Sequence, residues 1–457
     1  MINEWISIIM SNRTIPQFPP HFTVLDSLRG ICSVIVIMYH LFETYSTSLL
    51  DQKLNHGYLA VDFFFLLSGF VLSFSYEKVK TNFSSIDFII KRIIRLQPTQ
   101  LFGTVLGLLT FYSTKSNIFP LVQHTSVFQL FLVFFFSSQM IPIPPQYDIR
   151  GYQEMYPLNG PVWTLFFEYI GLLMFVLIIR KLKIQILSVV VFLCSVLLFG
   201  ISQNFDFFGF TTGRIDSKYK YSIMGGWTLE SSHLYIGFVR FSFSFLFGVL
   251  LEKVQVEKKF DFFNFSKIEK VENSKSKIEK VEKIQKCEIL TKSKIEKVEK
   301  FVNGYRLEIC SVLMVGVFCM PRLGGETFGA LNGLYDVFCV SVVFPLVLLL
   351  STQREGMNEG VEKHKAQIGF EKCANFFGNI SYQLYSINYS FIYYQMAWAE
   401  KHSENSGMSH FLFAVLMFVL CTAVSYAALK LFDIPMRKRL VDVYLEVCGE
   451  IAKAEKQ

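Results

Sequence analysis

Long apolar runs recur along the chain and are separated by shorter polar segments. Most are about 17–24 residues long, the length that an α-helix needs to cross about 30 Å of hydrocarbon. A helix pairs its own backbone polar groups where water is absent, so these runs predict membrane-spanning helices. The predicted spans lie at 24–46, 58–76, 88–112, 161–179, 184–201, 232–252, 307–320, 330–350, 376–397 and 410–431.

A further apolar stretch at 127–139 is shorter than these runs. Its 13 residues suit a re-entrant or interfacial segment better than a span. Composition agrees with a membrane protein: 52% of the residues are hydrophobic and 18% are charged, against roughly 25% charged in soluble domains. The predicted fold class is an all-α integral membrane protein with about ten transmembrane helices and this additional short segment.

The placement of basic residues tests this number of spans, because cytosolic loops carry excess Lys and Arg close to the membrane. With the N-terminus inside, the basic groups of the predicted inner loops are Lys78, Lys80, Lys91, Arg92 and Arg95; Arg180, Lys181 and Lys183; the block 253–306; Arg354, Lys363, Lys365 and Lys372; and Arg437, Lys438 and Arg439. Counting 127–139 as a full span would move the later groups outside. Ten spans with both termini cytosolic are therefore favoured, in a plasma or bacterial inner membrane.

The chain divides into one membrane domain and polar segments. The predicted parts are a cytosolic N-terminal segment 1–23, six spans in 24–252, a charged cytosolic loop 253–306, four spans in 307–435 and a cytosolic tail 436–457. The loop contains an imperfect repeat, with Ser-Lys-Ile-Glu-Lys-Val-Glu from Ser266, again from Ser276, and again from Ser293. Low complexity and high charge favour a solvated insertion, while an amphipathic helix or coiled segment is the alternative.

Charge and cysteine usage exclude some functions. The net charge of +7 comes largely from the lysine-rich loop, so we expect no nucleic-acid partner. The nine cysteines are scattered without a C-x-x-C pair, and several lie inside apolar runs. We therefore expect neither a disulfide framework nor a metal site. The N-terminus lacks the ordered features of a signal peptide.

The first predicted span carries ionisable residues that are expensive in lipid. Arg29 and His40 are 11 residues apart, which on a helix is a rise of about 16 Å with near-perfect alignment. Asp26 and Ser33 fall on the same stripe, so this face meets something other than lipid. For Arg29 alone interfacial snorkelling is the alternative, and for His40 a hydrogen bond between helices.

The second and third spans carry further polar candidates. Asp62 and Ser68 lie in the second span, where Ser68 and Gly69 would also allow a neighbouring helix to approach closely. Arg92 and Arg95, one turn apart at the start of the third, can bind phosphate oxygens. From these residues alone, ordinary positive-inside anchoring of the arginines is the favoured explanation.

Glu168 in the fourth span is the remaining charged candidate. It lies 12 residues before Arg180, about 18 Å above the inner surface. This matches the depth estimated for His40, so the two side chains are expected to meet. A carboxylate beside a histidine fixes its tautomer and raises its basicity, which suits a general base. A purely structural pairing of Glu168 is the alternative.

These residues together give the chain a resemblance to acyltransferase family 3, multi-pass membrane enzymes that O-acylate sugars, polysaccharides and other hydroxylated acceptors. The segments that carry the resemblance are Leu25–Gly30 with the Arg29-to-His40 spacing, Val61–Phe70, Arg92–Arg95, Trp163–Glu168, Gly378–Tyr385 and Phe432–Arg437. Any one of them is a weak signal. Their order and spacing across most of the membrane domain make the resemblance specific.

The resemblance implies roles for particular residues. The family's essential arginine and histidine fall on Arg29 and His40, and its Arg-x-x-Arg pair, associated with the acyl donor, falls on Arg92 and Arg95. Its tryptophan and glutamate fall on Trp163 and Glu168. We expect His40, Arg29 and Glu168 to be catalytic, and Asp62, Ser68, Trp163 and Tyr382 to bind substrate.

Two positions depart from the family pattern. Asn388 stands where the family commonly has a histidine, which puts a second histidine role in doubt. Asp433 replaces the usual glutamate before the final proline, and the charged insertion 253–306 is not typical.

The expected function is transfer of an acyl group, acetyl by default, from acyl-CoA as co-substrate to a hydroxylated acceptor such as a glycan, within a lipid bilayer. No bound cofactor is expected. The alternatives are a multi-pass transporter without chemistry, since intramembrane charges also build transport pathways, and a degenerate family member.

Overall fold

The computed structural model describes residues 22–79, 84–211, 219–258, 301–302, 304–353 and 364–454. These residues form helices and connecting loops, with one isolated β-bridge between Glu154 and Thr228 and no strand in the described ranges. The charged repeat within 253–306 lies almost wholly outside the described residues, as do Lys80, Arg354 and Lys363. The all-helical fold class is confirmed.

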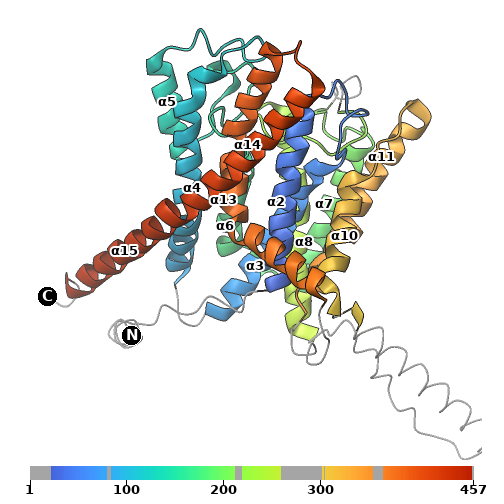
Figure 1. Cartoon of the computed structure of the whole chain (residues 1–457). Coiled ribbons are helices and arrows are strands. Elements are labelled where there is room, and N and C mark those ends of the chain that lie inside the picture. Colours follow the sequence, from blue (N-terminus) through green and yellow to red (C-terminus); the bar gives the residue numbers. More distant parts are fainter. Residues whose placement is uncertain are drawn as a thin grey trace, which may run out of the picture.

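The helices follow the predicted order (Figure 1). They are α2 (Thr23–Glu43), α3 (Ala60–Val79), α4 (Ser85–Thr110), α5 (Val127–Ser138), α6 (Val162–Leu177), α7 (Ile184–Ser202), α8 (Ser231–Lys258), α10 (Arg306–Cys319), α11 (Glu326–Phe338), α12 (Phe344–Ser351), α13 (Lys365–Lys401), α14 (Gly407–Ala427) and α15 (Ile434–Ala454). A π-helical segment, Cys339–Val343, joins α11 to α12.

Helices stand at all ten predicted span positions, but they differ in length and polarity. Among the described residues, six segments are long and apolar enough to cross a membrane: Thr23–Glu43, Gly57–Glu77, Ile184–Ser202, Ser231–Val256, Phe328–Ser351 and Gly407–Cys448. This makes the chain a multi-pass membrane protein. At the other four positions, α6 and α10 have 16 and 14 residues, while α4 and α13 do not meet the same criterion. The number of ten spans stays a prediction.

The short stretch expected to be re-entrant or interfacial forms α5, a helix of 12 residues. Figure 1 shows α5 beside the upper part of α4. Its last residues meet the middle of α4, where the side-chain amides of Gln97 and Gln100 donate to the carbonyls of Ser138 and Ser137. These bonds hold the end of this short helix against α4.

Two helix pairs form the centre of the bundle, and glycines let each pair approach closely. α2 packs along α13, where a Cβ atom on Gly30 would lie 2.3 Å from the backbone nitrogen of Gly378. α3 packs along α8, where a Cβ atom on Gly69 would lie 2.0 Å from the Phe245 carbonyl oxygen. The second contact confirms the expected close approach at Ser68–Gly69, and both fit small-residue packing of membrane helices.

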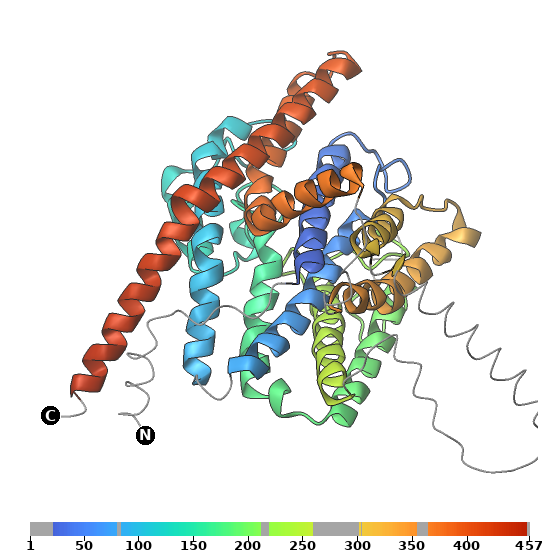
Figure 2. The same ribbon diagram turned by 60° about the horizontal axis from the view of Figure 1, so that its bottom comes forward.

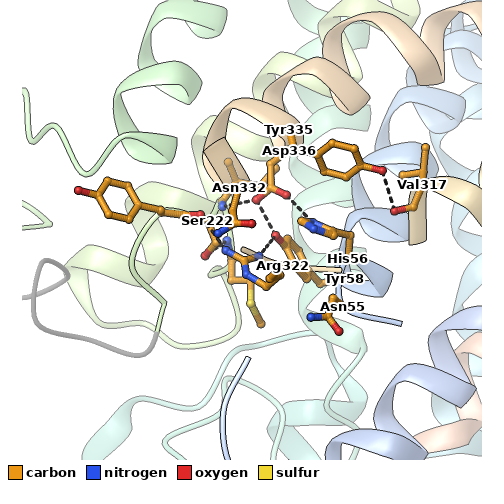
Figure 3. Close-up of polar contacts among 12 residues, drawn as sticks. Asn55, His56, Tyr58, Ser222, Val317, Arg322, Asn332, Tyr335 and Asp336 are labelled. Carbon is orange, nitrogen blue, oxygen red and sulfur yellow. Dashed lines mark hydrogen bonds and ion pairs between the residues drawn. The ribbon is translucent and has the colours of Figure 1, made fainter. Parts of the chain in front are cut away.

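We name the two sides of the bundle after the predicted orientation. The inner side carries the beginning of α2, and the outer side carries its end, at the top of Figure 1. A buried polar network ties outer segments together (Figure 3). The Asp336 carboxylate is within hydrogen-bond distance of His56 Nδ1 at 2.8 Å and accepts from the Tyr58 hydroxyl at 2.5 Å. Arg322 donates to the same hydroxyl at 2.9 Å.

The C-terminal part is a single long helix. α14 continues through a π-helical segment, Ala428–Asp433, into α15, and Figures 1 and 2 both show this red helix passing α4. The π segment places Asp433 where it accepts from Gln383 and pairs with Arg437. The predicted cytosolic tail therefore begins inside a helix.

Candidate active site

His40 lies in the last turn of α2, on the outer side. Its Nδ1 atom is 2.7 Å from a carboxylate oxygen of Glu43, one turn further along. The Tyr389 hydroxyl is 3.4 Å from both ring nitrogens, and the two rings meet edge to face at 4.9 Å. The His40 side chain is 19% exposed. A partly open imidazole beside a carboxylate can accept a proton and be stabilised as the cation.

Arg29, Arg92 and Arg95 gather on the inner side and form what we call the arginine cluster. Arg29 is paired with Asp26 at 3.4 Å, and its charge acts on both Arg92 and Arg95. Arg92 and Arg95 are partly exposed and make no hydrogen bond to another described residue. Guanidinium groups with free donors at one-turn spacing can bind phosphate oxygens.

Glu168 lies beside the arginine cluster. It accepts a hydrogen bond from the Ser68 hydroxyl at 2.7 Å, and the charges of Arg92, Arg29 and Arg95 act on it. The four helices α3, α4, α6 and α8 enclose a small pocket here, lined by Ser68, Leu72, Arg92, Leu96, Glu168, Tyr169, Leu172 and Phe245. A carboxylate at this place can hold an arginine in position.

The other predicted substrate-binding residues occupy separate places. Tyr382 donates to the Leu96 carbonyl at 2.7 Å, so it lies beside the arginine cluster. Trp163 is buried, with its ring edge-on to those of Phe65 and Phe167. Asp62 is fully buried and accepts two hydrogen bonds from Arg240, at 2.6 and 3.1 Å. In this structure Asp62 therefore joins α3 to α8, and its contact with substrate stays a prediction.

Comparisons with known proteins show the family to which the chain belongs. A family model described as an acyltransferase domain, that of acyltransferase family 3, matches residues 22–430. The chain belongs to acyltransferase family 3. It is also similar to "Protein 2 in picA locus" of Rhizobium radiobacter, with 28% identity over 162 residues, which is 34% of this chain and 81% of that protein. No solved structure gives a significant match.

The expected meeting of Glu168 and His40 does not occur in this family member. Tyr389 touches His40 and also packs where a Cβ atom on Gly160 would stand, 2.5 Å away. His40 is therefore level with Gly160, and Glu168 comes eight residues later, about 12 Å deeper. The depth estimate failed because it took Arg29 as the inner surface, whereas Arg29 lies near Glu168. The carboxylate at His40 is Glu43.

Three functional candidates of this acyltransferase were missed from the sequence. Glu43 is three residues after His40 in the same run, so helical spacing could have indicated it. Tyr389 directly follows Asn388, which is fully buried with both side-chain amide atoms unpaired among the described residues. Arg240 gives no local signal, since its partner Asp62 is 178 positions away.

Within the described ranges, no three His, Cys, Asp or Glu side chains group as a metal site would require.

Proposed function

We propose that this protein is a membrane O-acyltransferase that moves an acyl group, with acetyl as the simplest case, from acyl-CoA to a hydroxyl of a sugar or related acceptor. The observation that carries the proposal is the polarity of α2. One end holds Arg29 within the arginine cluster, and the other holds His40 between Glu43 and Tyr389.

The arginine cluster binds the donor. Arg92 and Arg95 take the phosphates of acyl-CoA from the predicted cytosolic side, and Arg29 adds charge at the same place. Arg29 is about 16 Å from His40 along the helix, so it positions the donor and does not reach the reacting carbonyl. An extended pantetheine arm spans this distance and brings the thioester to His40. Glu168 holds Arg92 in place, with Ser68 fixing the carboxylate.

His40 acts as the general base. It removes the proton from the acceptor hydroxyl, and the oxygen attacks the thioester carbonyl carbon. The C–O bond forms, the C–S bond breaks, and the CoA thiolate takes the proton from His40. Glu43 stabilises the imidazolium during this exchange, and Tyr389 can donate its hydroxyl proton in a hydrogen bond to the oxygen that becomes negative.

The first test is acetyl transfer from labelled acetyl-CoA in membranes, comparing wild type with His40→Ala at matched expression. We expect label in an alkali-labile ester with wild type, and a loss of about 10²- to 10⁴-fold in the variant, the usual contribution of a general base. His124→Ala, which changes an exposed loop histidine, is the control and should keep full activity. Full transfer by His40→Ala would overturn the assignment, and uptake of an unmodified solute without ester formation would favour a transporter.

A further inference from the structure

Glu154 stands near His40 but belongs to a different part of the chain. It lies in the loop before α6, outside the predicted spans, and is partly exposed. The loop is anchored there by the Glu154–Thr228 bridge and by a hydrogen bond from the Met155 amide to the Trp227 carbonyl at 2.8 Å. The carboxylate therefore has a fixed position on the outer side.

Tyr393 connects Glu154 to the active-site histidine. Its hydroxyl donates to one Glu154 oxygen, and its ring meets the Tyr389 ring edge to face at 5.1 Å. Tyr389 in turn contacts His40. The second Glu154 oxygen makes no hydrogen bond to any described residue, so it can accept one from a ligand.

Arg150 holds Tyr393 from the other face. Its guanidinium lies over the Tyr393 ring at 3.9 Å and donates to the Pro157 carbonyl and the Thr114 hydroxyl. Arg150 is fully buried. A cation that is buried and stacked in this way offsets part of the charge of Glu154 but cannot itself reach an incoming anion.

Two carboxylates therefore flank the Tyr389–His40 pair. Glu43 is 43% exposed on one side, and Glu154 lies on the other. Their charges act on one another and on Tyr389. The other charged neighbours of Glu154 are Arg150 and Asp148. The Asp148 carboxylate accepts hydrogen bonds from the backbone amides of Arg150, Gly151 and Gln153, and these bonds fix the loop.

We propose that Glu43 and Glu154 form an acidic entrance to His40 that admits uncharged or cationic hydroxylated acceptors and disfavours anionic ones. The inference rests on the proposed acyl transfer and adds the charge of the acceptor and the role of Glu154. A carboxylate pair repels an anionic group that must approach within a few ångströms, and it attracts a cationic one. The free oxygen of Glu154 can also accept a hydrogen bond from a hydroxyl group of the acceptor.

The test uses three glucosides that share the sugar ring and differ in the aglycone: 2-hydroxyethyl, 2-sulfoethyl and 2-(trimethylammonio)ethyl. Acetyl transfer from labelled acetyl-CoA is measured with the full chain in membranes, and kcat/KM is compared between the cationic and the anionic glucoside. We expect wild type to prefer the cationic over the neutral and the neutral over the anionic acceptor. Because each acceptor meets the same enzyme, the ratio does not depend on expression.

Glu154→Gln removes the charge but keeps an oxygen that accepts from Tyr393, and it should lower the cation-to-anion ratio about threefold to tenfold. Glu43→Gln should lower it similarly. Glu154→Asp retains the charge and should keep most of the ratio. Glu400→Gln is the matched control, because Glu400 is also an outer carboxylate with a hydrogen-bonded partner, Asn117, and it should leave the ratio unchanged.

The possible failures can be told apart. An unchanged ratio in both Glu154→Gln and Glu43→Gln, or a wild-type preference for the sulfonate, overturns the acidic entrance while acyl transfer stands. Absence of label in all three glucosides with wild type overturns the proposed function itself.

Discussion

The surroundings of the two ends of α2 differ in charge. At the inner end, Arg29 adds to Arg92 and Arg95 from α4. At the outer end, His40 has the carboxylate of Glu43 in contact and that of Glu154 beyond Tyr389. Phosphate binding needs free cationic donors, whereas proton removal needs a base whose cation is stabilised. In the proposed reaction, one helix thus separates donor binding from proton transfer by about 16 Å, and each end lies in surroundings whose charge suits its step.

The most damaging change would break the helix pair that holds both ends. Gly30→Leu puts a side chain where a Cβ atom already lies 2.3 Å from the Gly378 backbone, so α2 and α13 must separate. We expect loss of most folded protein, measured by size exclusion and thermal unfolding in detergent. Gly316→Leu is the control, because nothing lies within 4 Å of a Cβ atom there. Normal yield of Gly30→Leu would show that this crossing is not required.

The positive charge that α4 supplies at the inner end can be removed with Arg92→Ala combined with Arg95→Ala. We expect KM for acetyl-CoA to rise at least about 100-fold, since each of the two lost charged contacts is worth roughly 1.5–3 kcal/mol. KM for the acceptor should change little. Arg439→Ala, an exposed cation of α15, is the control. A rise confined to the acceptor KM would contradict the division between the two ends.

The outer end can be weakened with Glu43→Gln, which keeps an oxygen beside His40 but removes its charge. We expect kcat for acetyl transfer to fall about 10-fold with an unchanged KM for acetyl-CoA, because only the imidazolium loses stabilisation. Steady-state kinetics at saturating donor measure this. An unchanged kcat would remove Glu43 from the proton-transfer step.

The smallest effect should be a pH dependence of acceptor choice. Burial raises the pKa of Glu154 to about 7, so this carboxyl is largely neutral below that pH and charged above it. The preference for the cationic over the anionic glucoside should therefore grow a few-fold between about pH 6 and pH 8. The increase should be absent in Glu154→Gln.

The sequence predicted the elements better than their meeting points. Apolar runs and basic clusters located helices at all ten span positions, because length and polarity are local properties. Depth was less accurate: Glu168 was expected at His40 but lies near Arg92. Partners supplied by distant segments, such as Arg240 for Asp62 or Tyr393 for Glu154, depend on how helices rotate against each other. No periodicity in a single run contains that information.

The buried outer network also bears on how the chain assembles. His56 and Asp336 are 280 positions apart, and neither is more than 1% exposed. A chain that has inserted α3 but not yet α11 leaves His56 and Tyr58 without this acceptor, and an unpaired buried polar group costs about 1–3 kcal/mol. Asp336 completes hydrogen bonds with His56, Tyr58 and the Ile223 amide at once. The outer network is therefore completed only when this late carboxylate is in place. A chain that ends before Asp336 would leave polar groups without hydrogen-bond partners, a feature that quality control can recognise.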